Sequence, residues 1–323
     1  MARFQVLLTD YAWPDLEVER KILSAADIEI VEAPAQDEAT LIELARDVDA
    51  IMTCWANVPA SVISAAPKCQ LVSRLGIGLD NIDVAYCTEH KIPVTNVPTY
   101  CSYEVAEHAL ALVFALARNI GWFHWQTKQG TYELTTAPTM RRMTCQTLGI
   151  VGFGSTGEKL ATKAAGVGLR VLAHARSPKP ARPDVTFCDL DSLLRESDFV
   201  SLHLPLTEQT RHLIGDDELA KMKSTACLIN TARGGVVDQD ALTRALAENR
   251  IAGAGLDVQD PEPPDLSQPL FQDPRVIVTP HAAFTSQESL DELRNDAAEQ
   301  VADRLHGRRP ENVVNPEVFE DPA

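Results

Sequence analysis

Three polar residues in the second half of the chain could do chemistry together: Arg233, Glu262 and His281. Each follows an apolar run that predicts a strand, in "CLINTAR", "GLDVQDPEPP" and "VIVTPHAAF". In open α/β sheets the carboxyl ends of strands face the ligand crevice. There a guanidinium can hold a carboxylate through parallel hydrogen bonds. A carboxylate beside an imidazole favours the charged ring and makes a general acid or base near neutral pH.

Each of these residues also has a plain structural interpretation. Arg233 could form a salt bridge at the rim of the sheet, and Glu262 could be a solvated loop acid. His281 could cap a helix or be buried. Taken singly, Glu262 and His281 favour the structural interpretation, but their occurrence with Arg233 at successive strand ends favours a catalytic site.

A glycine motif formed by Gly152, Gly154 and Gly157 follows the predicted strand "TLGIV" and precedes the helical pattern "EKLATKAAGVG". Its glycines allow a tight turn and a close approach of backbone to a pyrophosphate, at a helix N-terminus whose N–H groups attract anions. The motif alone is weak, because a glycine-rich turn can also be packed tightly for structural reasons. Its context of strand, turn and helix favours a dinucleotide site.

Two series of short apolar strands, alternating with helical patterns, must position these residues. Such alternation predicts parallel sheets covered by helices on both faces, so the fold class is α/β with two doubly wound domains. The first series is predicted at Phe4–Leu8, Ile28–Val31, Asp49–Thr53 and Gln70–Gly76. The second is predicted at Thr147–Gly152, Arg170–Ala175, Asp198–Leu204, Cys227–Ala232, Ala254–Val258 and Val276–Pro280.

Two long helices are predicted, Ser102–Ile120 between the two series and Ser286–Gly307 after the second. The first is apolar nearly all round, which predicts burial between domains. If both helices cross between the domains, the first domain is discontinuous. We therefore expect residues 1–101 with 285–323 to form a substrate domain, and residues 102–284 to form a dinucleotide-binding domain.

The composition excludes several classes of function. The 323 residues suffice for two domains, and 45% hydrophobic with 23% charged residues is typical of a globular protein. A formal net charge of −17 argues against binding to nucleic acid or to anionic lipid. No signal peptide is apparent, and the longest apolar run, Ala109–Ala117, is too short to span a membrane. The seven cysteines lack CxxC spacing and a neighbouring His cluster, which predicts free thiols, no metal and a cytoplasmic location.

Several segments resemble the signature segments of the D-isomer-specific 2-hydroxyacid dehydrogenases, in order and over essentially the whole chain. They are "RLGIGLDNID", "NVPTYCSYEVAEHAL", "NTARGG", "GLDVQDPEPP" and "TPHAA". Among these enzymes, "SYEVAEH" and "PHAA…SQES" look most similar to the branch named for the C-terminal-binding proteins, including its bacterial dehydrogenase-like members. Phe284 stands where that branch often has Trp. The resemblance implies a Rossmann-type dinucleotide-binding domain and a smaller flavodoxin-like substrate domain, joined by the two crossing helices.

The resemblance also implies an NAD(P)-dependent enzyme that reduces a small 2-oxo acid to the D-2-hydroxy acid. Arg233 would hold the substrate carboxylate, His281 would exchange the proton, and Glu262 would pair with His281 and favour its charged form. The implied cofactor contacts are Ser155 and Thr156 at the pyrophosphate, Val105, Thr210, Thr231 and Ala232 around the nicotinamide riboside, and Asp257 at the carboxamide. The implied substrate contacts are Gly76 and Ile77, with Trp55 and Phe284 as candidate pocket walls. Trp55 fits a plain core or surface aromatic equally well.

The stretch "RVLAHARSPKP" bears on which dinucleotide binds. A chain that binds NAD usually ends this strand with an acid that holds the adenosine ribose hydroxyls. Ala175 stands there instead, followed by Arg176, Ser177 and Lys179. An acid would repel a 2′-phosphate, whereas Arg176 can form charge-assisted hydrogen bonds with one and Ser177 can offer a hydroxyl. The stretch favours NADP over NAD; the alternative is that Arg176 and Lys179 are solvated charges.

Other functions stay open at this point. Nucleotide-sensing corepressors of the resembled branch can retain all three site residues, although the acidic charge and the lack of a long disordered tail argue against one. A phosphite dehydrogenase is a further alternative, whereas formate enzymes of this fold carry Gln where this chain has Glu262. The Trp- and Tyr-rich segment Asn119–Thr144 is expected to be an extended arm on a homodimer surface, or else folded on its own domain. His108 is expected to be a packed helix histidine.

Overall fold

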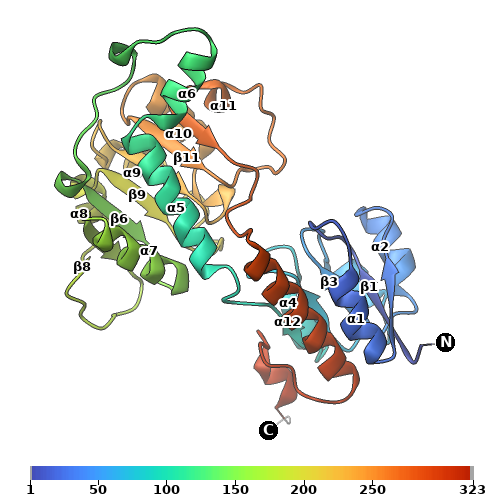
Figure 1. Cartoon of the computed structure of the whole chain (residues 1–323). Helices are drawn as coiled ribbons and strands as arrows, with labels where there is room; N and C mark the ends of the chain where they lie inside the picture. The colour runs from blue at the N-terminus through green and yellow to red at the C-terminus, as the bar shows by residue number, and fades with distance from the viewer. Residues whose placement is uncertain (1, 321–323) are drawn as a thin grey trace. The chain divides into compact units, whose positions relative to one another are not determined.

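A computed structural model describes residues 2–320, which divide into two compact units. Unit 1 is formed by the described residues of Met1–Tyr100 and Ser286–Ala323, and unit 2 by Cys101–Thr285. Each unit holds one parallel sheet with helices on both of its faces (Figure 1). The α/β class predicted from the alternation of strands and helices is confirmed. Between residues 2 and 320, no helix combines the length and the apolar character that crossing a membrane requires.

The sheet of unit 2 has seven strands in the order β12-β11-β10-β9-β6-β7-β8. Their bounds are β6 (Thr147–Val151), β7 (Arg170–His174), β8 (Thr186–Phe187), β9 (Phe199–Leu202), β10 (Cys227–Asn230), β11 (Gly253–Leu256) and β12 (Val276–Val278). All neighbouring pairs are parallel. The chain builds outward from β6 first through β7 and then, on the other side, through β9. The order reverses between β6 and β9, which is where sheets of this kind bind ligands.

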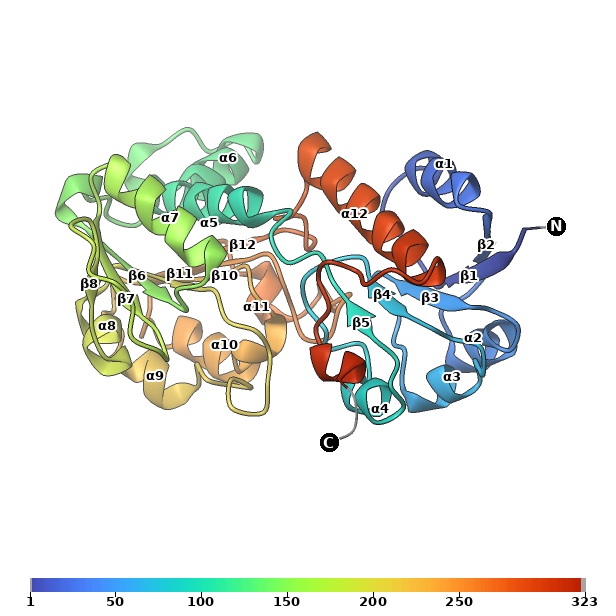
Figure 2. The same ribbon diagram turned by 90° about the horizontal axis from the view of Figure 1, so that it is seen from below.

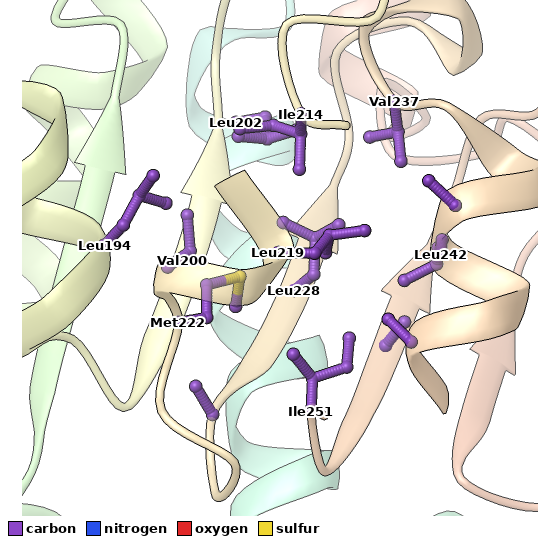
Figure 3. Close-up of a cluster of buried hydrophobic side chains, with 14 of the residues drawn as sticks. Leu194, Val200, Leu202, Ile214, Leu219, Met222, Leu228, Val237, Leu242 and Ile251 are labelled. Atoms are coloured by element: carbon purple, nitrogen blue, oxygen red, sulfur yellow. The ribbon is translucent and has the colours of Figure 1, made fainter. Parts of the chain in front are cut away.

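Helices cover both faces of this sheet, as Figure 2 shows. They are α5 (Ser102–Ala117), α6 (Ile120–Lys128) and α7 (Ser155–Gly166) on one side, and α8 (Leu190–Glu196), α9 (Asp216–Lys221) and α10 (Gln239–Ala247) on the other, with the short α11 (Pro269–Gln272) before β12. An apolar cluster that includes Val200, Leu228 and Leu242 fills the space beneath α8 to α10 (Figure 3). A second cluster, with Ile150 and Leu160, lies under α5 and α7. Burial on both faces is why the inner strands β6, β9, β10 and β11 are mostly apolar rather than alternating.

The sheet of unit 1 has five parallel strands in the order β2-β1-β3-β4-β5, the flavodoxin-like order. Their bounds are β1 (Phe4–Leu8), β2 (Ile28–Glu32), β3 (Ala50–Thr53), β4 (Val72–Arg74) and β5 (Val94–Thr95). Helices α1 (Glu17–Ala25) and α12 (Gln287–Leu305) cover one face, and α2 (Glu38–Ala45), α3 (Ala60–Ser64) and α4 (Val84–Glu89) cover the other (Figure 2). The buried Arg294 of α12 donates to both oxygens of Glu19 on α1, at 2.9 and 2.8 Å. The C-terminal helix is thereby tied to the N-terminal one.

Three details differ from the expectations. The segment Asn119–Thr144 is not an extended arm, because it begins with helix α6 and continues into short 3-10 turns. The aromatic residues there occur at helical spacing, which predicts a helix better than a strand. Strands β5 and β8 were missed because two-residue strands carry no readable periodicity. The helix expected to be buried between domains, α5, instead buries Ala106, Ala109 and Val113 against α7 and the sheet of its own unit.

Candidate active site

The glycine turn after β6 has the shape that a pyrophosphate site needs. Gly152 has a φ of +96°, and a Cβ there would lie 2.2 Å from the carbonyl oxygen of His203, so no side chain fits. A Cβ on Gly157 would lie 2.3 Å from the oxygen of Gly152, so the start of α7 packs directly on the turn. Around Gly154, by contrast, nothing among the described residues other than its two neighbours in the chain lies within 4 Å of the Cβ position. The space over the N-terminus of α7 is therefore open where a phosphate would bind.

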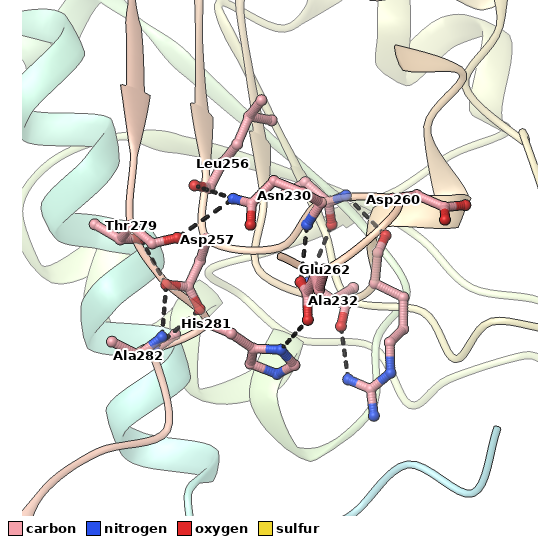
Figure 4. Close-up of polar contacts among 12 residues, drawn as sticks. Asn230, Ala232, Leu256, Asp257, Asp260, Glu262, Thr279, His281 and Ala282 are labelled. Carbon is pink, nitrogen blue, oxygen red and sulfur yellow. Dashed lines mark hydrogen bonds and ion pairs between the residues drawn. The ribbon is translucent and has the colours of Figure 1, made fainter. Parts of the chain in front are cut away.

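Arg233 lies in a turn that Asn230 holds from both sides. The Asn230 side chain, 1% exposed at the end of β10, accepts from the Ala232 N–H at 3.0 Å and donates to the Arg233 carbonyl at 2.8 Å. The Arg233 guanidinium donates to the carbonyl of Ala232 at 2.9 Å (Figure 4). A Cβ on Gly234 would lie 2.0 Å from the carbonyl group of Gln259, so this turn packs on the loop after β11.

Glu262 and His281 form the predicted pair. His281 Nδ1 lies 2.8 Å from Glu262 Oε2, while Glu262 Oε1 accepts from the backbone N–H of Gln259 at 2.8 Å (Figure 4). Because the carboxylate only accepts, Nδ1 carries a hydrogen and donates it. The Gln259 side chain in turn donates to the carbonyls of Leu256 and Thr279, at 3.2 and 3.3 Å, and so ties together the ends of β11 and β12. These two strand ends therefore present one acid–base pair.

The turn that carries His281 is held by Asp257. His281 has a φ of +52°, in the left-handed region, and its N–H donates to the Asp257 carbonyl at 2.7 Å. The fully buried carboxylate of Asp257 accepts from the N–H groups of Ala282 and Ala283, both at 2.9 Å. It also accepts from the hydroxyl of Thr279 at 2.5 Å. Its expected contact with the nicotinamide carboxamide stays a prediction.

The remaining expected cofactor residues follow strand ends of unit 2 or lie on its first helix. Val105 is half-buried on α5, and Thr231, 7% exposed, directly follows β10. The hydroxyl of Thr210 is used within its own loop, where it donates to the Pro205 carbonyl at 2.6 Å. After β7, Arg176 and Ser177 are exposed.

The expected substrate residues fall in both units. In unit 1, Trp55 follows β3, and Gly76 and Ile77 follow β4, which places all three at the carboxyl edge of the five-stranded sheet. In unit 2, the ring of Phe284 meets the His281 ring edge-on, with the centroids 6.2 Å apart.

Two residues that sequence reasoning missed hold the loops of unit 1. The carboxylate of Asp10 accepts from the backbone N–H groups of three consecutive residues, Cys54, Trp55 and Ala56, at 3.0, 2.7 and 3.2 Å. The buried guanidinium of Arg74 donates to the carbonyl of Gly78 at 3.0 Å and to that of Leu75. Their positions in the sequence could have pointed to both, because each is a charged residue at the carboxyl end of a predicted strand. Arg74 ends β4, and Asp10 lies two residues after β1.

Burial changes the pKa of several Cys and His side chains outside this site. Burial raises the pKa of the Cys54 and Cys227 thiols to about 12, which makes them poor nucleophiles. Burial likewise lowers the pKa of His203 from 6.5 to about 4, so that ring stays neutral. Within residues 2–320, no group of three or more His, Cys, Asp or Glu side chains could hold a metal ion.

These features occur in a chain that is similar to a known protein family and to enzymes of known activity. The family model described as "D-isomer specific 2-hydroxyacid dehydrogenase, NAD binding domain" matches residues 110–283. The chain is 41% identical to a glyoxylate reductase of Korarchaeum cryptofilum, over 89% of this chain and 88% of the relative. It is 34% identical to a hydroxypyruvate reductase of Thermotoga maritima, over 94% of this chain and 99% of the relative.

Solved structures agree over nearly the whole length. A glyoxylate reductase from Paecilomyes thermophila superposes with a TM-score of 0.87 at 28% identity, covering 98% of this chain and 100% of that one. An acyclic imino acid reductase in complex with NADPH and D-Arg superposes with a TM-score of 0.85 at 26% identity, covering 96% and 99%. Both similarities therefore extend over the two units.

Proposed function

The chain belongs to the D-isomer-specific 2-hydroxyacid dehydrogenase family, and from that membership we propose that its substrate is a small 2-oxo acid of the glyoxylate or hydroxypyruvate type. It is an NAD(P)-dependent oxidoreductase that reduces 2-oxo acids to D-2-hydroxy acids. The glyoxylate and hydroxypyruvate reductases described above support the choice of substrate class, because they match this chain over most of their length.

The residues of unit 2 have the chemistry that this reduction requires. When bound, the reduced nicotinamide supplies a hydride to the 2-oxo carbon. Negative charge then develops on the oxygen and needs a cation and a proton donor. Arg233 binds the substrate carboxylate and polarises the 2-oxo group, and His281 donates the proton from Nε2. Glu262 stabilises the imidazolium before transfer and keeps the hydrogen on Nδ1 after it.

The observation that carries this proposal is the 2.8 Å contact between His281 Nδ1 and Glu262 Oε2. Glu262 follows the strand next to that of Arg233 and His281 follows the strand after that, in a sheet whose switch point holds the glycine turn. We propose further that Gly76, Ile77, Trp55 and Phe284 contact the substrate, which makes unit 1 the substrate domain. The position of Gly76, Ile77 and Trp55 at the carboxyl edge of the sheet of unit 1 supports this proposal for those three residues.

Turnover of a panel of 2-oxo acids tests the activity directly. Oxidation of NADPH and NADH is followed with glyoxylate, hydroxypyruvate, pyruvate and bulkier oxo acids. We expect turnover with the smaller acids, strong impairment in Arg233→Lys, which keeps the charge but loses the planar fork, and near-complete loss in His281→Ala. No turnover with any acid, or full turnover in His281→Ala, would overturn the mechanism.

We propose that NADPH is the preferred reductant. Arg176, Ser177 and Lys179 are exposed after β7, and within residues 2–320 Arg176 forms no ion pair. Arg182, in contrast, is engaged, because its guanidinium donates to Asp184 at 2.6 Å and to Glu158 at 3.0 Å. Arg176 is thus the guanidinium available for a 2′-phosphate, and charge-assisted hydrogen bonds of this kind contribute about 1.5–3 kcal/mol.

Kinetics with both cofactors test this preference. We expect kcat/KM to favour NADPH, and the preference to fall in Ala175→Asp combined with Arg176→Ala and to shrink with added salt. Arg170→Ala is the matched control, because Arg170 is an exposed arginine at the other end of β7, paired with Glu196 at 2.8 Å. A wild-type enzyme that prefers NADH tenfold would show that the argument from this stretch is wrong.

We also propose that the chain forms a homodimer through Asn119–Thr144. Helix α6 has no buried residue, and apolar side chains of the segment are exposed, among them Trp125 (52%), Tyr132 (91%) and Leu134 (88%). Such aromatic exposure is typical of a partner surface. Light scattering at micromolar concentration should give twice the monomer mass of 35.3 kDa. A monomer mass would contradict the proposal.

The narrower resemblance to the C-terminal-binding branch stays a prediction, and a corepressor function stays the alternative to it. The relatives described above are glyoxylate and hydroxypyruvate reductases, which supports an enzyme of small oxo acids instead.

A further inference from the structure

The backbone turn of His281 is held in a conformation that it would rarely adopt alone. Its φ of +52° lies in the left-handed region, which is unfavourable for a residue with a side chain. Three successive N–H groups, those of His281, Ala282 and Ala283, donate to the carbonyl and carboxylate of Asp257. In Figure 4 the Asp257 carboxylate lies between Thr279 and this turn. Whatever holds Asp257 therefore also holds the place of His281.

A hydrogen-bonded chain connects Asp257 to helix α5. Thr279 Oγ1 lies 2.5 Å from Asp257 Oδ1 and 3.0 Å from His108 Nε2. The carboxylate accepts only, so the hydroxyl hydrogen of Thr279 is directed at Asp257. The hydroxyl oxygen must then accept, and the donor is the Nε2–H of His108. His108 Nε2 also lies 3.6 Å from Asp257 Oδ1, so any positive charge on this ring faces the buried carboxylate.

We propose that His108 is a positioning residue for His281, acting through Thr279 and Asp257. The proposal rests on the proton-transfer role of His281 given above. Helix α5 is 16 residues long and packs on α7 and on the sheet, so it provides a rigid point of attachment. A buried charge needs hydrogen-bonded partners, and the hydroxyl of Thr279, which His108 contacts, is one of the partners of Asp257.

A role for Asp257 in binding the cofactor predicts a different kinetic pattern. If the chain from His108 serves His281, its loss misplaces the proton donor and lowers kcat, with little change in the KM for NADPH or NADH. If the chain serves cofactor binding alone, its loss raises the cofactor KM and leaves kcat unchanged. The split between kcat and KM therefore separates the two roles.

The test uses pairs of variants that break or keep each hydrogen bond. Thr279→Val and His108→Phe remove the link, whereas Thr279→Ser keeps the hydroxyl and His108→Gln keeps an N–H donor. We expect Thr279→Val to lower kcat about tenfold or more, since it removes a hydrogen bond to the charged Asp257. His108→Phe removes a hydrogen bond to a hydroxyl group, and we expect it to lower kcat about threefold to tenfold. The Ser and Gln variants should recover most of it. Thr279→Val combined with His108→Phe should have about the same kcat as the less active of the two single variants, because both substitutions break the same series of hydrogen bonds.

The controls separate this inference from a loss of folding and from the proposed function. His306→Phe removes a histidine of unit 1 whose Nε2 lies 2.8 Å from the carbonyl of Ala26, and should leave kcat unchanged. Thermal unfolding checks that each variant is folded. Wild-type kcat in folded His108→Phe, while His281→Ala is inactive, would overturn the positioning role alone. Additive losses in the double variant would overturn it too. Wild-type turnover in His281→Ala would overturn the proposed function and this inference together.

Discussion

Replacing Glu262 by Gln is the sharpest perturbation of the acid–base pair, because it changes hydrogen-bonding capacity with almost no change in shape. The carboxylate faces two donors, the backbone N–H of Gln259 and Nδ1–H of His281, each at 2.8 Å. A glutamine side chain offers one accepting oxygen and one donating NH₂ group. If its oxygen accepts from Gln259, its NH₂ group faces His281 Nδ1. Only an imidazole with its hydrogen on Nε2 tolerates that arrangement.

This tautomer cannot deliver a proton as the wild-type ring does. In the wild type the imidazolium gives up the Nε2 hydrogen and keeps the one on Nδ1. In Glu262→Gln the imidazolium would place Nδ1–H against NH₂, so the charged form loses its partner. A hydrogen bond to a charged group contributes about 1.5–3 kcal/mol, which corresponds to a loss of about 10- to 150-fold in kcat. The KM for NADPH should stay unchanged, because the glycine turn is untouched.

The assay is steady-state oxidation of NADPH at saturating cofactor with varied glyoxylate. Glu248→Gln is the matched control, since Glu248 is exposed at the end of α10 and pairs with Arg250 at 2.9 Å. Thermal unfolding of both variants checks their folding. A folded Glu262→Gln enzyme with kcat within about twofold of the wild type would refute the assignment of hydrogens drawn from these two contacts.

Three further predictions follow from other contacts. Gly234→Ala should lower kcat/KM about 100-fold, because its Cβ would lie 2.0 Å from a backbone carbonyl and must displace the arginine-bearing turn, whereas Gly166→Ala, with open space, should leave kinetics unchanged. Unfolding in urea should show a stability loss of about 2 kcal/mol between pH 7 and pH 5 that His203→Gln removes. Stability falls with falling pH because the pKa of His203 is about 4 in the folded protein and 6.5 in the unfolded chain. The unfolded chain therefore binds the proton first, and proton binding favours unfolding. Labelling of the native protein with a thiol reagent at pH 8 should modify the exposed Cys145 first, with the buried Cys227, whose pKa is about 12, unmodified until unfolding; prior labelling of Cys227 would contradict this order.

Much of the fold could be read from local pattern. Short apolar runs between turn residues predicted ten strands that the structure contains, because a strand covered on both faces is apolar at most of its positions. The glycine motif located the turn after β6, since the positive φ of Gly152 and the close contact of Gly157 exclude side chains whatever surrounds them. The pairing of Glu262 with His281 was also expected, because both follow adjacent strands of a parallel sheet.

What holds the site in place was decided only by the tertiary structure. His108 looked like any packed helix histidine, because its partner Thr279 is 171 residues away. Asn230 and Gln259 were passed over for a similar reason: polar side chains next to a strand end do not reveal which backbone groups they meet. The left-handed backbone of His281 cannot be predicted from residue propensity, which disfavours it. The hydrogen bonds that Asp257 accepts from the N–H groups of this turn help to stabilise it. Local sequence determines which segments become strands and helices, whereas the positions of catalytic atoms depend on contacts that exist once distant strands lie side by side.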